Sequence, residues 1–174
     1  MIFVTVGTER FPFDRLLRAV DKLARQGLLK DVYCQIGASV YKPAYCSYKV
    51  FLPFEEVVYC IQESELVIAH GGAGIVALCL KFGKIPILAP RQKRFGEHVD
   101  DHQVEFARHM ERLQRAVAIL DLERFDEALA KQHQLQMSWE SGQLSLPQQN
   151  SLLGTHLREL LARWEQTLYP STSK

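Results

Sequence analysis

The chain has 174 residues, of which 47% are hydrophobic and 10% aromatic, so it can build a hydrophobic core without disulfide or metal support. Its 21 lysine and arginine residues almost balance 20 aspartate and glutamate residues, which argues against a nucleic-acid-binding surface. The four cysteines form no C-x-x-C pair, a pattern typical of reduced thiols in a cytosolic protein.

Short apolar runs alternate with amphipathic segments, which is the pattern of an open parallel sheet with helices on both faces. The first run, IFVTV at 2–6, predicts a strand that ends at Gly7-Thr8, and it lacks the basic start of a signal peptide. Further strands are expected at 32–37, 48–53, 66–69, 85–89 and 116–120. Helices are expected at 11–26, at 54–64, from about 73, from about 99 and at 122–132.

The composition changes after Lys131. Residues 132–149 are glutamine-rich and weakly patterned, so a loop is expected there. Beyond it, apolar residues at helical spacing predict a C-terminal amphipathic helix, which packs either on its own domain or on a partner; they are Leu153, Leu157, Leu160, Leu161, Trp164 and Leu168. We therefore divide the chain into a domain at 1–131 and a loop with an amphipathic helix at 132–174.

The helix from about 99 is expected to bury four apolar residues, Val99, Phe106, Met110 and Leu113.

The stretch LVIAHGGAGIVALCL at 66–80 is almost free of charge, but its unbroken apolar part is too short for a membrane span. A buried strand, the turn HGGAG and a helix are expected instead. Ligands of open parallel sheets bind outside the carboxyl ends of the strands, and free helix N–H groups attract anions such as a diphosphate. The spacing alone does not distinguish such a site from a tight turn without a ligand, nor a ligand-binding His70 from a satisfied buried histidine. The spacings of the G-x-G-x-x-G and Walker A motifs are absent.

Charged and polar residues are dense in APRQKRFGEHVDDHQ at 89–103, directly after a predicted strand. Basic side chains suit phosphate, and carboxylate, imidazole and carboxamide groups suit hydroxyls. His98 and His102 lie four residues apart with Asp101 nearby, so a metal site has to be considered. Because the spacing specifies no third ligand, we expect no metal; the alternative to a ligand-binding loop is a solvated helix start.

The segments FVTVGT, AHGGAG, GKIPILAPR and FGEHVDDHQ, in this order, resemble the small subunit of two-component bacterial exopolysaccharide and capsule glycosyltransferases. These proteins are similar to the C-terminal half of a GT-B enzyme and, more distantly, to the eukaryotic dolichol-linked N-acetylglucosaminyltransferase catalytic subunit. The resemblance covers about residues 1–120. It implies a Rossmann-like domain that binds a UDP-sugar and needs no cofactor.

The resemblance also assigns substrate-binding residues. It implies that Gly7 and Thr8 lie near the diphosphate or sugar and that Arg91 is a counter-charge. The turn implied to hold the diphosphate consists of His70, Gly71, Gly72, Ala73 and Gly74. His102 and Gln103 match a histidine-glutamine element whose carboxamide faces the sugar hydroxyls, and Glu97 and His98 belong to a GEH signature. At Leu78, where many GT-B donor domains have a glutamate for the ribose, this sequence has an apolar residue.

The resemblance implies a donor-binding subunit of an inverting, metal-independent hexosyltransferase in extracellular polysaccharide synthesis. A membrane-associated partner would bind the lipid-linked oligosaccharide acceptor and supply the general base, so the heterodimer would lie at the cytoplasmic face of the membrane. The alternative is a non-catalytic enhancer that activates such a partner without binding a nucleotide, and the missing carboxylate at Leu78 supports it. The sequence does not select the sugar.

Overall fold

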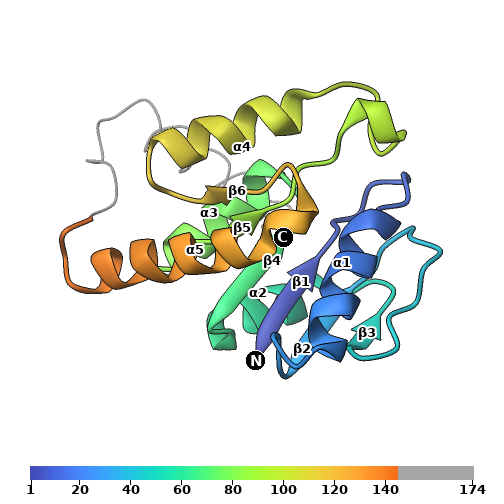
Figure 1. Ribbon diagram of the computed structural model, residues 1–174, viewed down its shortest axis with the longest axis horizontal. Helices are drawn as coiled ribbons and strands as arrows, with labels where there is room; N and C mark the ends of the chain where they lie inside the picture. Colours follow the sequence, from blue (N-terminus) through green and yellow to red (C-terminus); the bar gives the residue numbers. More distant parts are fainter. Residues whose placement is uncertain (145–174) are drawn as a thin grey trace, which may run out of the picture.

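The structure is a computed structural model that describes residues 1–144. It contains six parallel strands in the order β3-β2-β1-β4-β5-β6, an open sheet with helices on both faces (Figure 1). The strands are β1 (Ile2–Thr5), β2 (Val32–Gln35), β3 (Ser47–Lys49), β4 (Leu66–Ala69), β5 (Ile87–Leu88) and β6 (Val117–Ala118). The helices are α1 (Asp14–Arg25), α2 (Phe54–Glu63), α3 (Ala73–Lys81), α4 (His102–Arg112) and α5 (Phe125–Glu140), with 3-10 turns η1 (Lys93–Phe95) and η2 (Leu122–Arg124). The predicted Rossmann-like fold class is confirmed. The predicted C-terminal helix lies outside the described residues.

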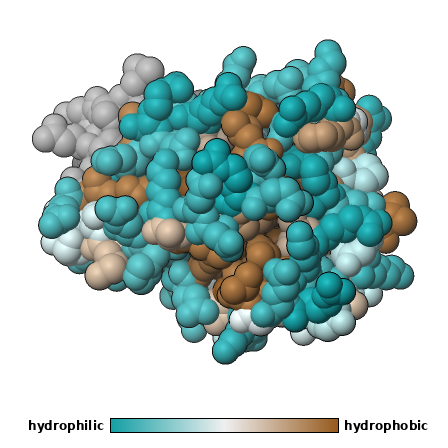
Figure 2. All heavy atoms as spheres, viewed as in Figure 1, coloured by the Kyte–Doolittle hydropathy of each residue, from teal (hydrophilic) through white to brown (hydrophobic). Residues whose placement is uncertain are grey.

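The alternation of side chains along β1 divides the hydrophobic core between the two faces of the sheet. Ile2 and Val4 belong to the cluster that includes the buried residues of α1, whereas Phe3 belongs to the cluster that includes those of α2 and α3. Because β1 is central and pairs with both β2 and β4, both of its faces are covered and all four of its residues are buried. Figure 2 shows a mostly hydrophilic surface on one side of the molecule, with apolar residues grouped between α1 and α5.

The expected loop from residue 132 is corrected, because α5 continues to Glu140. The glutamines that weaken the apolar pattern bind the backbone ahead of β5. Gln132 donates from Nε2 to the carbonyl of Ile85 at 3.0 Å, and Gln136 accepts from the Ile85 N–H at 2.8 Å while donating to the carbonyl of Gly83. Hydrogen bonds to a neighbouring backbone therefore hold a helix that hydrophobic periodicity does not indicate.

Two further expectations differ from the structure. The helix expected from about 99 begins only at His102, so Val99 lies in the preceding loop and is 58% exposed. Leu113 is the residue directly after the C-terminal end of α4 and is 38% exposed. Phe106 is half-buried, whereas Met110 is buried as predicted. The strand expected at 48–53 is limited to the edge strand β3, which leaves Leu52 in the connection to α2. Within residues 1–144, no helix combines the length and the apolar character needed to cross a membrane.

Candidate functional site

A pocket of about 410 Å³ opens at the carboxyl ends of β1, β2 and β4. Its lining includes five residues that the sequence predicted for the site: Gly7, Thr8, His70, Gly72 and Gly74. It also includes six that the prediction missed: Thr5, Gln35, Leu52, Phe54, Val57 and Ile75. Thr5 and Gln35 end β1 and β2, Leu52 follows β3, and the other three residues lie on α2 and α3. The rule that ligands bind at the carboxyl edge could therefore have indicated Gln35 and Leu52.

Two positions in this pocket require glycine because they lie against the imidazole of His70. A Cβ atom at Gly7 would lie 2.5 Å from Cε1 of His70, and a Cβ at Gly72 would collide with Nε2 of the same ring. Gly7 also has a φ of 78°, which favours glycine. The backbones after β1 and β4 therefore approach the imidazole closely from two sides.

The His70 side chain is neutral at physiological pH. Its burial, and secondarily the positive charge of Arg91, lower its pKa to about 4. Its Nδ1 is buried, and so is Oε1 of Gln35, and neither atom has a hydrogen-bond partner within the described residues. Nε2 of Gln35 donates to the carbonyl of Gly7 at 3.3 Å, which fixes the carboxamide beside the pocket. Two buried polar atoms at one pocket without partners are typical of a site that is completed by a ligand or by water.

The amino end of α3 forms the anion-binding side of the pocket. Gly72 is the residue before the helix, its φ of −82° and ψ of 129° are extended, and no side chain caps the helix. The first turn of α3 holds no acidic residue. The N–H groups at this helix start, together with the helix dipole, favour a negatively charged ligand. Ala73 is the first residue of α3 but does not line the pocket.

Arg91, which the sequence predicted as a counter-charge, has a fully buried side chain and does not line this pocket. Its guanidinium donates to the carbonyls of Phe11 and Val6, both at 2.7 Å, and to that of Glu97 at 3.3 Å. It also lies over the ring of Phe13 at 4.8 Å. Arg91 therefore joins the loop after β1 to the loop after β5, and its charge reaches the pocket only as a long-range field.

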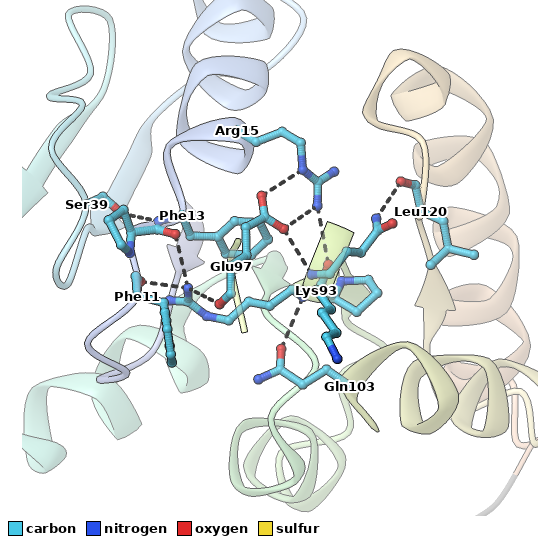
Figure 3. Close-up of polar contacts among 12 residues, drawn as sticks. Phe11, Phe13, Arg15, Ser39, Lys93, Glu97, Gln103 and Leu120 are labelled. Atoms are coloured by element: carbon cyan, nitrogen blue, oxygen red, sulfur yellow. Dashed lines mark hydrogen bonds and ion pairs between the residues drawn. The ribbon is translucent and has the colours of Figure 1, made fainter. Parts of the chain in front are cut away.

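Glu97, which the sequence also predicted to bind substrate, pairs with a residue of α1 and does not line the pocket. Its side chain is 5% exposed and pairs with Arg15 of α1, with Nε to Oε1 at 2.9 Å and Nη2 to Oε2 at 3.0 Å (Figure 3). The same Oε2 accepts the N–H of Gln92 at 3.0 Å. These bonds fix the loop between β5 and α4 on α1.

Gln103 and Gly71, which the sequence also predicted to bind substrate, lie against each other, and neither lines this pocket. Oε1 of Gln103 accepts the N–H of Arg91 at 3.2 Å, and the side chain is buried. A Cβ at Gly71 would lie 2.8 Å from the carbonyl oxygen of Gln103, so only glycine fits between the turn and the start of α4. This contact places the HGGAG turn against the first turn of α4.

The rings of His98 and His102 lie together, and the third group beside them is Asp100. Nδ1 of His98 lies 3.2 Å from Oδ1 of Asp100, and Nδ1 of His102 contacts the same oxygen. Asp101, which the sequence suggested as their neighbour, instead accepts the Lys93 N–H at 2.9 Å and closes the loop. None of these residues lines the pocket of His70. Leu78 is 3% exposed in the core beneath α3 and does not face a ligand.

Residues 1–149 of the chain match the model of a protein family, the glycosyltransferase family 28 C-terminal domain. The search of curated proteins returned no match. Among solved structures, the glycotransferase of kitacinnamycin is 14% identical with a TM-score of 0.59, and the calicheamicin glycosyltransferase CalG4 is 13% identical with a TM-score of 0.56. MurG of Acinetobacter baumannii is 18% identical with a TM-score of 0.55. The matches cover 97%, 94% and 92% of this chain but 42%, 43% and 49% of those chains, so the chain spans less than half of their length.

Proposed function

The chain belongs to the family of glycosyltransferase family 28 C-terminal domains, and from this premise we propose that its pocket binds the UDP-sugar donor of a two-component hexosyltransferase. The observation that supports this most directly is the pocket itself. It combines the open start of α3, the neutral imidazole of His70 and the unpartnered carboxamide oxygen of Gln35 at one edge of the sheet.

Each part of a nucleotide-sugar has a counterpart in the pocket under this proposal. The N–H groups at the start of α3 bind the diphosphate. Leu52, Phe54, Val57 and Ile75 provide an apolar wall for the uracil ring. Gln35 and Thr8 offer an amide and a hydroxyl for the hydroxyl groups of the sugars. Leu78 is excluded from ribose binding by its burial, so ribose recognition falls to other residues.

The proposed reaction is a direct displacement. An acceptor hydroxyl of a lipid-linked oligosaccharide attacks the anomeric carbon, the bond from this carbon to the diphosphate oxygen breaks, and UDP leaves with inversion. The helix N–H groups stabilise the negative charge that develops on the leaving diphosphate. No metal ion is assigned to this step. The resemblance of FGEHVDDHQ and AHGGAG supports a membrane-associated partner that binds the acceptor, supplies the base and holds the chain at the cytoplasmic face.

Calorimetric titration of the purified chain with UDP, and separately with ADP, tests donor binding. UDP is expected to bind and ADP to bind more weakly. The Gly72→Asp variant is expected to lose binding, because it places a carboxylate at the diphosphate position and against His70. Ala130→Asp on the exposed side of α5 is the matched control and should bind UDP like the original chain. Equal UDP affinity in Gly72→Asp would contradict the proposal.

A second function is favoured by the absence of a carboxylate at Leu78: the chain activates its partner without binding a nucleotide. Co-expression with a candidate membrane partner, followed by sugar transfer from a panel of UDP-sugars to a lipid carrier, separates the two functions. Donor binding predicts that Gly72→Asp abolishes transfer. The enhancer function predicts that transfer persists in that variant and that UDP does not bind to the isolated chain.

A further inference from the structure

The end of the loop between β5 and α4 and the first residue of α4 bring two imidazoles and one carboxylate together. The donor atoms of His98, Asp100 and His102 all lie within 4.8 Å of one another. Oδ1 of Asp100 lies between the two rings, at 3.2 Å from Nδ1 of His98 and in contact with Nδ1 of His102. The ring centroids are 4.6 Å apart and the rings are nearly perpendicular. Among the described residues this is the one group of three such side chains with this geometry.

We propose that His98, Asp100 and His102 form a binding site for a divalent transition metal of the zinc class. For bonds of about 2.0–2.2 Å to imidazole nitrogen and carboxylate oxygen, tetrahedral ligands are separated by roughly 3.3 Å. The separation of 3.2 Å between Nδ1 of His98 and Oδ1 of Asp100 matches this value. Nδ1 of His102 lies closer than this to the same oxygen, so metal binding requires the His102 ring to move away from Asp100. Two nitrogen donors and one oxygen donor suit Zn²⁺ rather than Mg²⁺ or Ca²⁺, which prefer oxygen ligands alone.

The site is held in place by its surroundings. The side chain of His98 is only 10% exposed, and its ring lies 5.9 Å from that of Phe11. The loop that carries the cluster is closed by the bond from Lys93 to Asp101 and anchored through the ion pair of Glu97 with Arg15. A ligand set that is already ordered loses less conformational entropy when it binds a metal.

The same geometry assigns different roles to the two neighbouring aspartates. Asp100 directs its carboxylate to both imidazoles, whereas Asp101 is engaged by the backbone of Lys93. The side chains of Asp100 and His102 are 56% and 57% exposed, so a metal can enter from solvent. Three protein ligands leave a fourth tetrahedral position for water or for an oxygen of another molecule. This site does not depend on the proposed donor binding, because none of its residues lines the pocket.

Equilibrium dialysis of the full chain against Zn²⁺ tests the site, with Co²⁺ as a spectroscopic probe. One equivalent of Zn²⁺ is expected to bind, and Co²⁺ should give the visible absorption of a tetrahedral complex. Asp100→Asn and His102→Ala, both at exposed positions, should fold normally and weaken binding at least about 100-fold, more than the loss of an outer-shell partner. The affinity should also fall as pH decreases, because protonated imidazoles do not bind metals.

Two variants are matched controls. His109→Ala removes an exposed histidine from the outer part of α4, and Cys46→Ser removes the half-buried thiol. Both should retain the zinc equivalent and the cobalt spectrum. The proposal is overturned if the original chain binds no Zn²⁺, or if His102→Ala and Asp100→Asn bind it as tightly as His109→Ala does.

Discussion

Arg15 and Glu97, separated by 82 residues in the sequence, form a two-pronged ion pair with nitrogen-to-oxygen distances of 2.9 and 3.0 Å. The pair joins α1 to the loop that carries the histidine cluster. The carboxylate is almost inaccessible, with 5% of its side chain exposed, whereas Arg15 is 23% exposed. Glu97, which the sequence suggested for substrate binding, therefore fixes the loop of the histidine cluster on α1.

Removal of this carboxylate should lower stability rather than donor affinity. Glu97→Ala leaves the N–H of Gln92 without its acceptor and Arg15 with only the Pro90 carbonyl at 3.4 Å. The free energy of unfolding should therefore fall by about 2–3 kcal/mol in urea titrations. Glu123→Ala, which breaks the exposed pair with Lys22, should change stability by less than about 0.5 kcal/mol. If both variants had equally small effects, the structural role of Glu97 would be wrong.

Gly72→Ala should destabilise the protein through a direct clash with His70. The backbone at Gly72 is in an ordinary extended conformation, so the cost arises from the collision of the new Cβ with the imidazole. A loss of about 1–3 kcal/mol is expected from thermal or urea unfolding. His70→Ala should relieve part of this loss when it is combined with Gly72→Ala. Purely additive effects of the two substitutions would contradict the contact.

The stability of the protein should depend on pH through His70. The folded-state pKa of about 4 lies below the ordinary value of 6.5, so between these values the unfolded chain binds a proton that the folded chain does not. The stabilisation is complete above about pH 6.5 and decreases as the pH falls towards 4, by up to about 3 kcal/mol. Urea unfolding of the original chain and of His70→Gln across this range isolates the contribution. His109→Gln, at an exposed position, should keep the original pH dependence.

Gln35→Met should weaken UDP-sugar binding more than it affects stability. Methionine retains the shape of glutamine but loses the unpartnered oxygen and a 3.3 Å hydrogen bond to Gly7. An affinity loss of about tenfold is expected by calorimetry, the equivalent of about one good hydrogen bond. Gln132→Met is the control, because this buried glutamine bonds to Ile85, neither residue lines the pocket, and the change should affect stability alone. If Gln35→Met lowered stability but left UDP affinity unchanged, Gln35 would not belong to the binding site.

Leu78→Glu should not restore a ribose contact. The side chain is 3% exposed within the core beneath α3, so a carboxylate there is buried without a partner. Unfolding measurements should show a loss above about 3 kcal/mol, with no gain in UDP affinity. Leu78→Met, which conserves volume, should cost less than about 1.5 kcal/mol. A tighter UDP complex in Leu78→Glu would show that this position reaches the ligand.

The sequence alone determined the fold class and the turn at the centre of the pocket. The alternation of buried strands with helical stripes predicts the parallel sheet, because each element must cover its apolar side. Strand β4 and the start of α3 lie where the stretch from Leu66 to Ala73 indicated, since a glycine-rich break between two apolar segments leaves few alternatives. Gly7, Thr8, His70, Gly72 and Gly74 were brought to one pocket for the same reason: they all follow strands whose carboxyl ends meet at one edge.

Only the tertiary structure decided which polar residues face the pocket. The density of polar residues after a predicted strand, together with the family resemblance, placed Arg91, Glu97 and Gln103 in a ligand-binding loop. In the fold their hydrogen-bond partners come from distant segments, and burial makes each of these bonds obligatory. Likewise Asp100 rather than Asp101 joins the two histidines, since the choice depends on which carboxylate the Lys93 N–H engages. Local spacing cannot encode these pairings, because they arise when loops from separate strands are packed together.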